Sequence, residues 1–412
     1  MRGHDGSRIL SAQRPVSDTY FRKGFGLGKE IAGELNAYHS QLVDRIREDG
    51  HRLTVGDLTF RLAKEFGFCY GVDRAVEYAY ETRAKFPDRR VFLVGEIIHN
   101  PHVNDELQAR GITIIHYDPN RDFDFSAVQA DDVVLLPAFG VTARDFQRLR
   151  ELGCVLVDTT CGSVLNVWKR VERYAKEGFT AVVHGKHYHE ETKATVSQAT
   201  RHEGGKYLIV RDMDEAERLC RYIETGDNLD EMVALFRERV SPGFDFTTDV
   251  ERIGVANQTT MLANESLAIA HRIGEALAKR WGGAALPEHF RSFDTICSAT
   301  QERQDAVLEL IDEPLDVMIV IGGYNSSNTN NLATICSRRR RTYHISDSTC
   351  IDPEANTIRH KLHGRTDEMV TDHWLERDVR LIGITAGAST PNNKIGEVIE
   401  RILAIRGEAV PA

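Results

Sequence analysis

Residues 293–301 read FDTICSATQ, an apolar approach that ends in DTIC, with a helical pattern beginning just after Cys297. A similar stretch, VLVDTTCGS, occupies 155–163 around Cys161, and a looser one, EFGFCYGV, lies at 65–72 around Cys69. In each stretch one cysteine stands where a predicted strand gives way to a predicted helix. Because the three stretches lie far apart in the sequence, we predict three similar α/β units that each bring one cysteine to a common centre.

Short apolar runs alternate with longer segments of helical spacing through most of the chain. The apolar runs predict buried strands at 91–94, 112–115, 133–136, 155–157, 181–183, 207–210, 253–256, 317–321 and 381–384. Helices are expected between them, for example at 164–176 and 262–279. Such alternation is typical of parallel sheets with helices on both faces. We therefore predict an α/β fold of three similar domains with mostly parallel sheets, arranged around one centre.

The cysteines also divide the chain into expected domains. Residues 1–57 are polar, contain a helical pattern at 30–48, and are expected to form an N-terminal extension that wraps the body. A transit peptide is an alternative that the acidic residues disfavour. The expected units are 58–160 with Cys69, 161–296 with Cys161, 297–385 with Cys297, and a C-terminal segment at 386–412 that closes the active site.

The composition excludes several classes of protein. The 412 residues carry a formal net charge of -10, which argues against binding of nucleic acid or an anionic membrane by the protein as a whole. No apolar run is long enough to span a bilayer, and the N-terminus lacks the apolar core of a secretory signal. Seven widely spaced cysteines then indicate reduced thiols in a cytoplasmic compartment, and hence metal binding or catalysis.

Cys69, Cys161 and Cys297 share a local setting that the other cysteines lack. The others, expected to be small buried residues, are Cys154, Cys220, Cys336 and Cys350. Three thiolates could hold zinc or an iron–sulfur cluster. Structural zinc usually takes ligands in close pairs, and no C-x-x-C occurs here. Three lone cysteines favour a cluster with one iron free of protein ligands, which could act as a Lewis acid and deliver electrons.

Small and polar residues follow the predicted strands, where ligands bind in parallel sheets. The sequence HGKHYHEE at 184–191 could ligate a metal, form a surface loop, or supply anion donors and a proton source. GGYNSSN at 322–328 and GASTP at 387–391 combine glycines with helix-capping residues, a composition suited to phosphate at helix N-termini. These strand ends predict a small, polar, anionic ligand.

With these motifs in this order, the chain resembles the 4-hydroxy-3-methylbut-2-enyl diphosphate reductase family from Arg61 to Ile402. The resemblance is carried by 67–75, 98–100, 158–161, 257–260, 294–297, 322–328 and 384–391. Two further segments, 22–26 and 184–186, resemble the cyanobacterial and plant branch of the family. The resemblance implies an oxidoreductase of isoprenoid biosynthesis, the last enzyme of the methylerythritol phosphate route.

The resemblance also implies a cofactor and a reaction. A [4Fe–4S] cluster would be held by Cys69, Cys161 and Cys297, with one open iron. Two electrons and two protons would remove the hydroxyl of 4-hydroxy-3-methylbut-2-enyl diphosphate as water, giving isopentenyl and dimethylallyl diphosphates. No flavin or nicotinamide motif stands out, so electrons are expected from a separate ferredoxin- or flavodoxin-like protein, in the cytoplasm or, for a plant chain, the plastid.

Individual residues acquire roles through the same resemblance. Glu191 would be the proton donor, and Thr259 would lie near the substrate hydroxyl and help to position Glu191. The residues expected to contact the diphosphate or line its pocket are His99, His189, Ser326, Ser327, Asn328 and Ser389. Phe139 departs from the common pattern, since many members have a diphosphate-binding histidine there, and His187 is one substitute that the sequence offers.

Two other classes of function stay open at this point. A non-catalytic iron–sulfur sensor or scaffold would use the three cysteines but leave the polar strand ends unexplained, and the sequence shows no helix-turn-helix or basic patch. A zinc hydrolase built on 184–191 would leave the three cysteines without a role. The metal that the protein binds distinguishes the zinc hydrolase from the other two.

Overall fold

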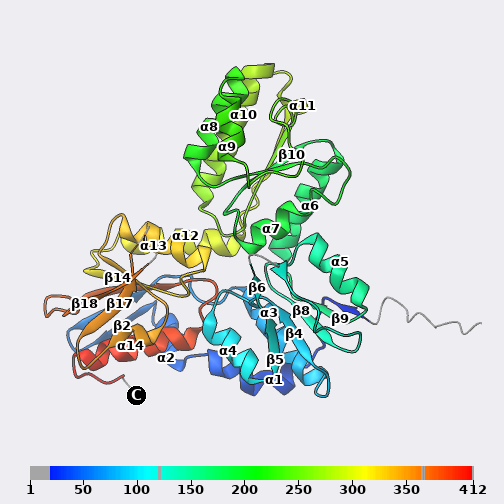
Figure 1. Ribbon diagram of the computed structural model, residues 1–412. Coiled ribbons are helices and arrows are strands. Elements are labelled where there is room, and N and C mark those ends of the chain that lie inside the picture. Colours follow the sequence, from blue (N-terminus) through cyan, green and yellow to red (C-terminus); the bar gives the residue numbers. More distant parts are fainter. Residues whose placement is uncertain (1–18, 119–121, 363–364, 366, 411–412) are drawn as a thin grey trace, which may run out of the picture.

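The computed structural model describes residues 19–118, 122–362, 365 and 367–410. Three lobes, each built on its own β-sheet, meet at the centre of the molecule (Figure 1). The expected start of the N-terminal extension, residues 1–18, lies outside the described part of the chain. The nine strands expected from the sequence are all present, and the prediction of an α/β fold with mostly parallel sheets is confirmed.

The first lobe holds a sheet of five parallel strands. In order across the sheet they are β1 (Tyr20–Phe21), β9 (Val155–Asp158), β8 (Val133–Leu136), β4 (Val91–Val94) and β5 (Ile112–Ile115). Its helices are α1 (Gly28–Leu35), α3 (Tyr70–Lys85), α4 (Pro101–Ala109) and α5 (Ala143–Leu152), and β6 (Tyr117–Asp118) and β7 (Asp122–Phe123) form a separate hairpin. Both faces of the sheet are covered, which explains why β4 and β8 are apolar at every position.

The second lobe, uppermost in Figure 1, has four parallel strands. Across the sheet they are β11 (Tyr207–Val210), β10 (Thr180–His184), β12 (Ile253–Asn257) and β13 (Phe290–Ser292). Its helices are α6 (Gly162–Lys176), α7 (Glu190–Val196), α8 (Met213–Thr225), α9 (Leu229–Leu235), α10 (Ala263–Trp281) and α11 (Leu286–His289). Val182 packs on the face with α8 and α10, whereas its neighbour Val183 packs with α6, since successive strand residues point to opposite sides.

The third lobe contains the largest sheet, parallel at its centre and antiparallel at both edges. Across the sheet the strands are β16 (Ile351–Asp352), β17 (Thr357–Lys361), β15 (Thr342–Ile345), β14 (Val317–Ile321), β19 (Leu381–Ala386), β3 (Leu58–Leu62) and β2 (Arg52–Val55), with β18 (Glu368–Asp372) paired to β17. The helices are α2 (Gln41–Glu48), α12 (Ser298–Ile311), α13 (Ser327–Ser337) and α14 (Asn392–Ile405), with a short 3-10 turn at Ser348–Cys350. A second 3-10 turn, Asn36–Tyr38, lies between α1 and α2, and its Tyr38 packs in the core of the first lobe.

The third lobe is assembled from two distant parts of the chain. Strand β3 pairs in parallel with β19, and α2 packs on α14. The division expected at 57/58 therefore falls within the β2–β3 hairpin, and the segment expected to close the active site contributes a helix to this core. The helical pattern at 30–48 is divided, because Ser40 caps a new helix by accepting the N–H of Val43 at 3.4 Å.

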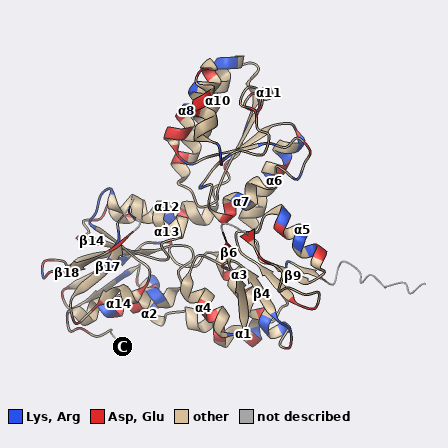
Figure 2. Ribbon diagram, viewed as in Figure 1, with Lys and Arg blue, Asp and Glu red and all other residues tan. Residues whose placement is uncertain are grey.

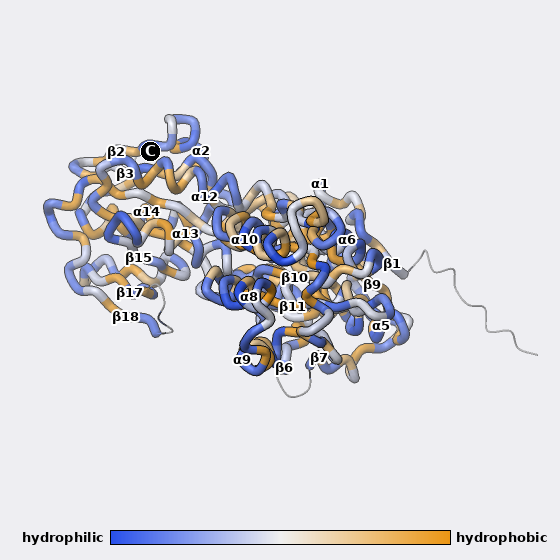
Figure 3. Tube along the Cα trace, turned by 90° about the horizontal axis from the view of Figure 1, so that it is seen from above, coloured by the Kyte–Doolittle hydropathy of each residue, from blue (hydrophilic) through white to orange (hydrophobic). Residues whose placement is uncertain are grey.

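Charged residues lie mainly on the outward-facing helices, and hydrophobic segments lie mainly inside each lobe (Figures 2 and 3). Within the described ranges, no helix is both long enough and apolar enough to cross a membrane. The carboxyl ends of β3, β9 and β12 all lead into loops at the junction of the lobes, so the topology concentrates these loops at one place.

Glu81 ties the N-terminal segment to α3 and provides a test of this packing. The carboxylate is 2% exposed and accepts the N–H groups of Phe25 at 2.6 Å and Leu27 at 2.7 Å. We expect Glu81→Ala to leave both donors unpaired and to weaken local docking by about 1–3 kcal/mol. Trypsin should then cleave within 22–29 roughly tenfold faster or more, whereas Glu48→Ala, at the exposed end of α2, should leave the cleavage rate unchanged.

Candidate active site

Each of the three predicted cluster cysteines immediately precedes a helix. Cys69 precedes α3, Cys161 precedes α6 and Cys297 precedes α12, all with the extended backbone of an N-cap residue. A helix carries partial positive charge at its N-terminus. Three such ends around one point favour a negatively charged group between them, as a cluster bound by three thiolates would be.

The thiols of Cys69 and Cys161 both approach Gly71. A Cβ atom on Gly71 would lie 2.5 Å from the Sγ of Cys161 and 4.0 Å from the Sγ of Cys69. Cys297 is close enough to Cys69 for charge on one thiol to raise the pKa of the other. The glycine therefore keeps open a space between the thiols that any side chain would fill.

The spacing of the three thiols fits a cluster better than a single ion. The Sγ atoms of Cys69, Cys161 and Cys297 do not all lie within 4.8 Å of one another. Tetrahedral zinc, with Zn–S bonds of about 2.3 Å, would require sulfur–sulfur distances of about 3.8 Å. The donor set, three lone thiols around an open space, suits the several metal atoms of an iron–sulfur cluster.

Burial makes these thiols poor thiolates on their own. It raises the pKa of Cys297 to about 11 and raises the pKa of Cys69 as well. A bound metal centre reverses this preference, because a coordinating thiol is deprotonated.

The backbone of each cysteine is fixed by a loop that follows another strand. In every case the cysteine N–H donates to a carbonyl oxygen, so the three loops are held in the same way. The bonds are Cys69 N to Ala388 O at 3.3 Å, Cys161 N to Ala138 O at 2.8 Å, and Cys297 N to Thr259 O at 3.4 Å. These loops follow β19, β8 and β12, respectively, which explains why all three lobes are needed to form the centre.

Arg303, a residue that the sequence analysis did not single out, joins two of the cysteine loops. It lies on α12, is 3% exposed, and donates to the carbonyl oxygen of Gly67 at 2.8 Å and that of Phe68 at 3.2 Å. Its charge also lowers the pKa of Cys69, against the larger effect of burial. The guanidinium thus connects the Cys69 turn to the Cys297 helix and adds positive charge beside the thiols.

Glu191 and Thr259 form the link from α7 to the cysteine loops. The Glu191 carboxylate is 3% exposed and accepts the N–H of Thr259 at 2.6 Å. Burial raises the pKa of Glu191, although the bonds from Thr259 partly oppose this. A carboxyl group in this setting retains its proton to higher pH than an exposed one, as a proton donor requires.

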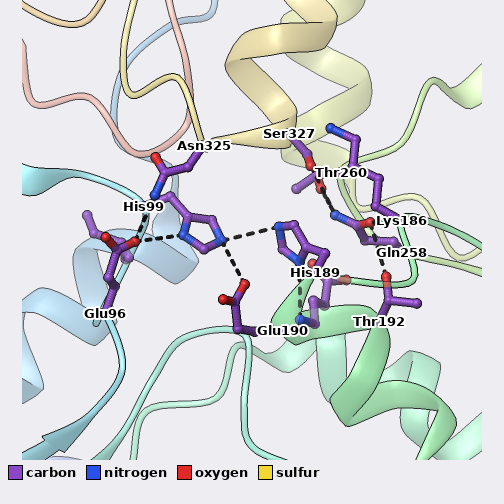
Figure 4. A network of polar contacts seen from close by, with 12 residues as sticks. Glu96, His99, Lys186, His189, Glu190, Thr192, Gln258, Thr260, Asn325 and Ser327 are labelled. Atoms are coloured by element: carbon purple, nitrogen blue, oxygen red, sulfur yellow. Dashed lines mark hydrogen bonds and ion pairs between the residues drawn. The ribbon is translucent and has the colours of Figure 1, made fainter. Parts of the chain in front are cut away.

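His99 and His189 face each other across the junction of the first two lobes (Figure 4). Their Nε2 atoms lie 3.2 Å apart. The Nδ1 of His189 accepts the N–H of Glu191 at 3.1 Å, so its proton, when the ring is neutral, belongs on Nε2. Burial, followed by the charge of His99, holds the pKa of His189 well below its ordinary value. His189 therefore offers a neutral N–H donor toward the space beside His99.

Phe139 contributes a contact in place of a hydrogen bond. Its ring stacks on His99, with centroids 4.7 Å apart and an interplanar angle of 13°. The charged groups that act on His187 are Arg239, Glu215, Glu238 and Arg211. His187 lines the same cavity as His99 and Phe139, with these charged groups of the second lobe around it, whereas His189 contacts His99 directly.

Among the described residues, one group of three has potential metal-ligand atoms that all lie within 4.8 Å of one another. Its members are His99, His189 and Glu190. His184 does not join them, because it is buried in β10 with its Nδ1 2.8 Å from the Ser266 hydroxyl, and burial lowers its pKa to about 4. The histidines of 184–191 are thus divided between a buried structural position and the site.

The carboxyl ends of β14 and β19 supply polar groups at two helix N-termini. Ser326 caps α13, and the Oδ1 of Asn328 accepts the N–H of Ala388 at 2.9 Å. The Nδ2 of Asn328 is buried and has no partner among the described residues. Ser389, just before α14, donates to the carbonyl oxygen of His99 at 3.1 Å. These loops therefore adjoin His99, with a free buried donor available to an anion.

Gln258 links this region to α7, a role that the sequence did not reveal although the residue lies in a motif. Its Nε2 donates to the hydroxyls of Ser327 at 3.3 Å and Thr260 at 2.9 Å, while its Oε1 accepts from Thr192 at 3.2 Å (Figure 4). The amide is fully buried, so these bonds fix the position of α7, and hence of Glu191, against α13.

A cavity of about 1190 Å³ opens between the first two lobes and reaches this network. His99, Phe139, His189 and Asn325 line it. It gives a small polar molecule a path from solvent to the histidines, and its volume lies somewhat above the range of about 300–1,000 Å³ that is usual for ligand pockets.

The chain matches the family model described as LytB protein over residues 60–403. It is 48% identical over 406 residues to the 4-hydroxy-3-methylbut-2-enyl diphosphate reductase of Thermosynechococcus vestitus, covering 98% of this chain and 99% of that one. It is 46% identical over 392 residues to the protein of the same name from Gloeothece citriformis, covering 95% and 96% of the two chains.

Two solved structures share the fold. A structure of (E)-4-hydroxy-3-methyl-but-2-enyl diphosphate reductase aligns with a TM-score of 0.51 and 27% identity, covering 83% of this chain and 98% of that one. The corresponding reductase from Plasmodium falciparum aligns with a TM-score of 0.61 and 20% identity, over 84% and 87% of the chains. The resemblance seen in the sequence motifs is thus confirmed by matches over nearly the whole chain, and the chain belongs to the LytB protein family.

Proposed function

We propose that this chain is a 4-hydroxy-3-methylbut-2-enyl diphosphate reductase and completes the methylerythritol phosphate route to isoprenoids. The reaction is a reductive dehydration, in which two electrons and two protons convert the allylic alcohol to water and the two isomeric five-carbon diphosphates. The observation that carries the proposal is the continuous contact from buried Glu191 through Thr259 to Cys297. Through it, Thr259 would stand between the proposed proton donor and one of the proposed cluster ligands.

The cofactor in this proposal is a [4Fe–4S] cluster held by Cys69, Cys161 and Cys297. When bound, it supplies electrons and an open iron that acts as a Lewis acid toward the substrate hydroxyl. The chain's own contribution is to fix the three thiols at helix N-termini and to leave the space beside Gly71 open.

The substrate diphosphate would lie between the histidines and the two helix N-termini of the third lobe. The residues proposed to hold it or line its pocket are His99, His189, Ser326, Ser327, Asn328 and Ser389. Two buried donors would be available to the diphosphate: the neutral N–H of His189 and the Nδ2 of Asn328, which has no partner among the described residues. Phe139 would hold the His99 ring by stacking, and the Glu96 carboxylate, 2.9 Å from its Nδ1, would orient the ring so that its Nε2 faces the Nε2 of His189, 3.2 Å away.

Proton delivery is assigned to Glu191. Because burial raises its pKa, the carboxyl group can hold a proton until negative charge develops on the substrate carbon. Thr259 would lie near the substrate hydroxyl, and its N–H fixes the carboxyl oxygen of Glu191 at 2.6 Å. The same elements that bury Glu191 also exclude water from it.

Electrons would come from a ferredoxin- or flavodoxin-like protein, in the cytoplasm or, for a plant chain, in the plastid. The alternative of a non-catalytic iron–sulfur sensor gains no support, because it uses neither Glu191 nor the strand-end donors, and the relatives are named as a reductase. The zinc-hydrolase alternative would need a metal bound by His99, His189 and Glu190. The same three residues also fit an anion site, in which the histidines donate hydrogen bonds and Glu190 accepts one.

Turnover of 4-hydroxy-3-methylbut-2-enyl diphosphate by the anaerobic protein, with a reduced viologen dye as electron source, tests the function directly. We expect formation of isopentenyl and dimethylallyl diphosphates. Absence of both products from protein that contains four irons per chain would refute the reductase assignment.

Cys297→Ser should release the cluster, because an alcohol replaces one of three thiolate ligands. We expect several-fold less bound iron and loss of turnover, with the same outcome for Cys69→Ser and Cys161→Ser. Cys220→Ala, a change at a buried cysteine of the second lobe, should retain the iron. Full iron content in all three serine variants would contradict the ligand assignment.

Glu191→Gln tests the proton donor without changing the shape of the site. The amide oxygen can still accept the Thr259 N–H, but the side chain has no acidic proton to give. We expect turnover to fall roughly 10²- to 10⁴-fold with iron content unchanged. Glu203→Gln, an exposed residue at the rim of the cavity, should turn over at the normal rate, and full turnover by Glu191→Gln would exclude this role.

A further inference from the structure

The outer face of α6 lies between two hollows that meet at Lys169. One, of about 680 Å³, is lined by Cys297 together with Lys169, Arg170 and Arg173. The other, of about 690 Å³, lies on the side of the first lobe. Together they form what we term the α6 basic surface, whose cationic residues are Arg22, Arg144, Arg150, Lys169, Arg170, Arg173 and Arg201.

The charge of this surface is opposite to that of the protein. Seven Lys and Arg residues line the two hollows, against three acidic residues, Asp158, Glu172 and Asp294. The whole chain has 52 Lys and Arg against 62 Asp and Glu. Figure 2 shows the basic segments on α6 and on the neighbouring α5. The sequence has no basic patch, because these residues come from four separate segments that the fold brings together.

Several of these cations are available to a partner. Lys169 is exposed and has no ion pair among the described residues, and the Arg170 guanidinium lies over the exposed ring of Phe293, 3.9 Å from its centroid. Within the described part of the chain Arg173 pairs only with Glu177, at 3.6 Å, and both are exposed, so solvent screens that pair. An exposed aromatic ring among arginines is typical of the centre of a protein interface.

The hollow beside Cys297 reaches the metal site from a different side than the substrate cavity. None of its lining residues also lines the cavity that contains His99 and His189. A protein bound at this hollow would approach Cys297 directly and leave the substrate cavity uncovered on that side. The second hollow is different, because it shares Val141, Arg144, Ser197 and Thr200 with the substrate cavity. Electron transfer slows steeply with distance, so a donor protein bound at the hollow beside Cys297 would transfer electrons to the metal centre faster than one bound elsewhere.

We propose that the α6 basic surface docks an acidic electron-carrier protein, which passes electrons to the metal centre at its Cys297 edge. The inference rests on the proposed function, because that reaction consumes two electrons and the chain shows no second redox motif. A one-electron carrier would dock twice per turnover, being oxidised each time as the cluster is reduced. Opposite charge steers such partners together and fixes their orientation.

The variant Lys169→Glu/Arg173→Glu tests the surface with two electron donors. With a reduced viologen dye, which needs no docking, we expect the wild-type rate. With a reduced acidic [2Fe–2S] ferredoxin at low ionic strength, we expect the KM for ferredoxin to rise on the order of tenfold or more. The difference should shrink as salt is added. The matched control, Arg218→Glu/Arg221→Glu on α8, makes the same change in net charge far from the metal site.

Binding provides a readout that does not depend on turnover. The Kd of oxidised ferredoxin for the iron-loaded protein should rise by a similar factor in the α6 variant and stay unchanged in the control. If the α6 variant loses iron, Arg150→Glu/Arg201→Glu in the second hollow replaces it. Unchanged ferredoxin affinity in both α6-surface variants would overturn the proposal. It would also be overturned if these variants lost affinity for RNA or for a second copy of the chain while their ferredoxin affinity stayed the same. Failure of viologen turnover in the wild type would instead count against the proposed function.

Discussion

The structure depends on holding three helix N-termini at one point. The positive ends of α3, α6 and α12 repel one another, so their meeting requires hydrogen bonds to fix the loops and negative charge to occupy the centre. Each cysteine N–H supplies one such bond to a loop from another strand end, and Arg303 joins two of the loops through backbone carbonyls. Formation of the site and assembly of the lobes are therefore the same process.

Burial acts in opposite directions on the pKa values of two polar groups beside this centre. Burial raises the pKa of Glu191 and lowers that of His189, so both favour their neutral forms although they are two residues apart. One neutral group carries an acidic proton and the other carries an N–H donor. Gln258 bonds α7 to α13, so the positions of Glu191 and His189 at the start of α7 depend on this buried amide.

The three-lobed arrangement also separates the routes into the site. The substrate cavity lies between the first and second lobes and ends at His99 and His189, while the hollow at Cys297 lies against α6. In the proposed function, the anionic substrate and the electron-carrier protein would thus approach the site from different sides.

The sequence by itself determined nine of the strands, the positions of the three cysteines just before helices and the cap that Ser326 gives to α13, because these depend on contiguous residues: strands buried on both faces are apolar throughout, and caps are local. The loop at 387–391 supplies no side-chain cap to α14. Only the tertiary structure decided that β3 pairs with β19, that Arg303 reaches the carbonyl of Gly67 from 236 positions away, and that scattered arginines form the α6 basic surface. Strand pairing and long side-chain contacts are set by the packing of whole lobes, which leaves no periodic pattern in the sequence.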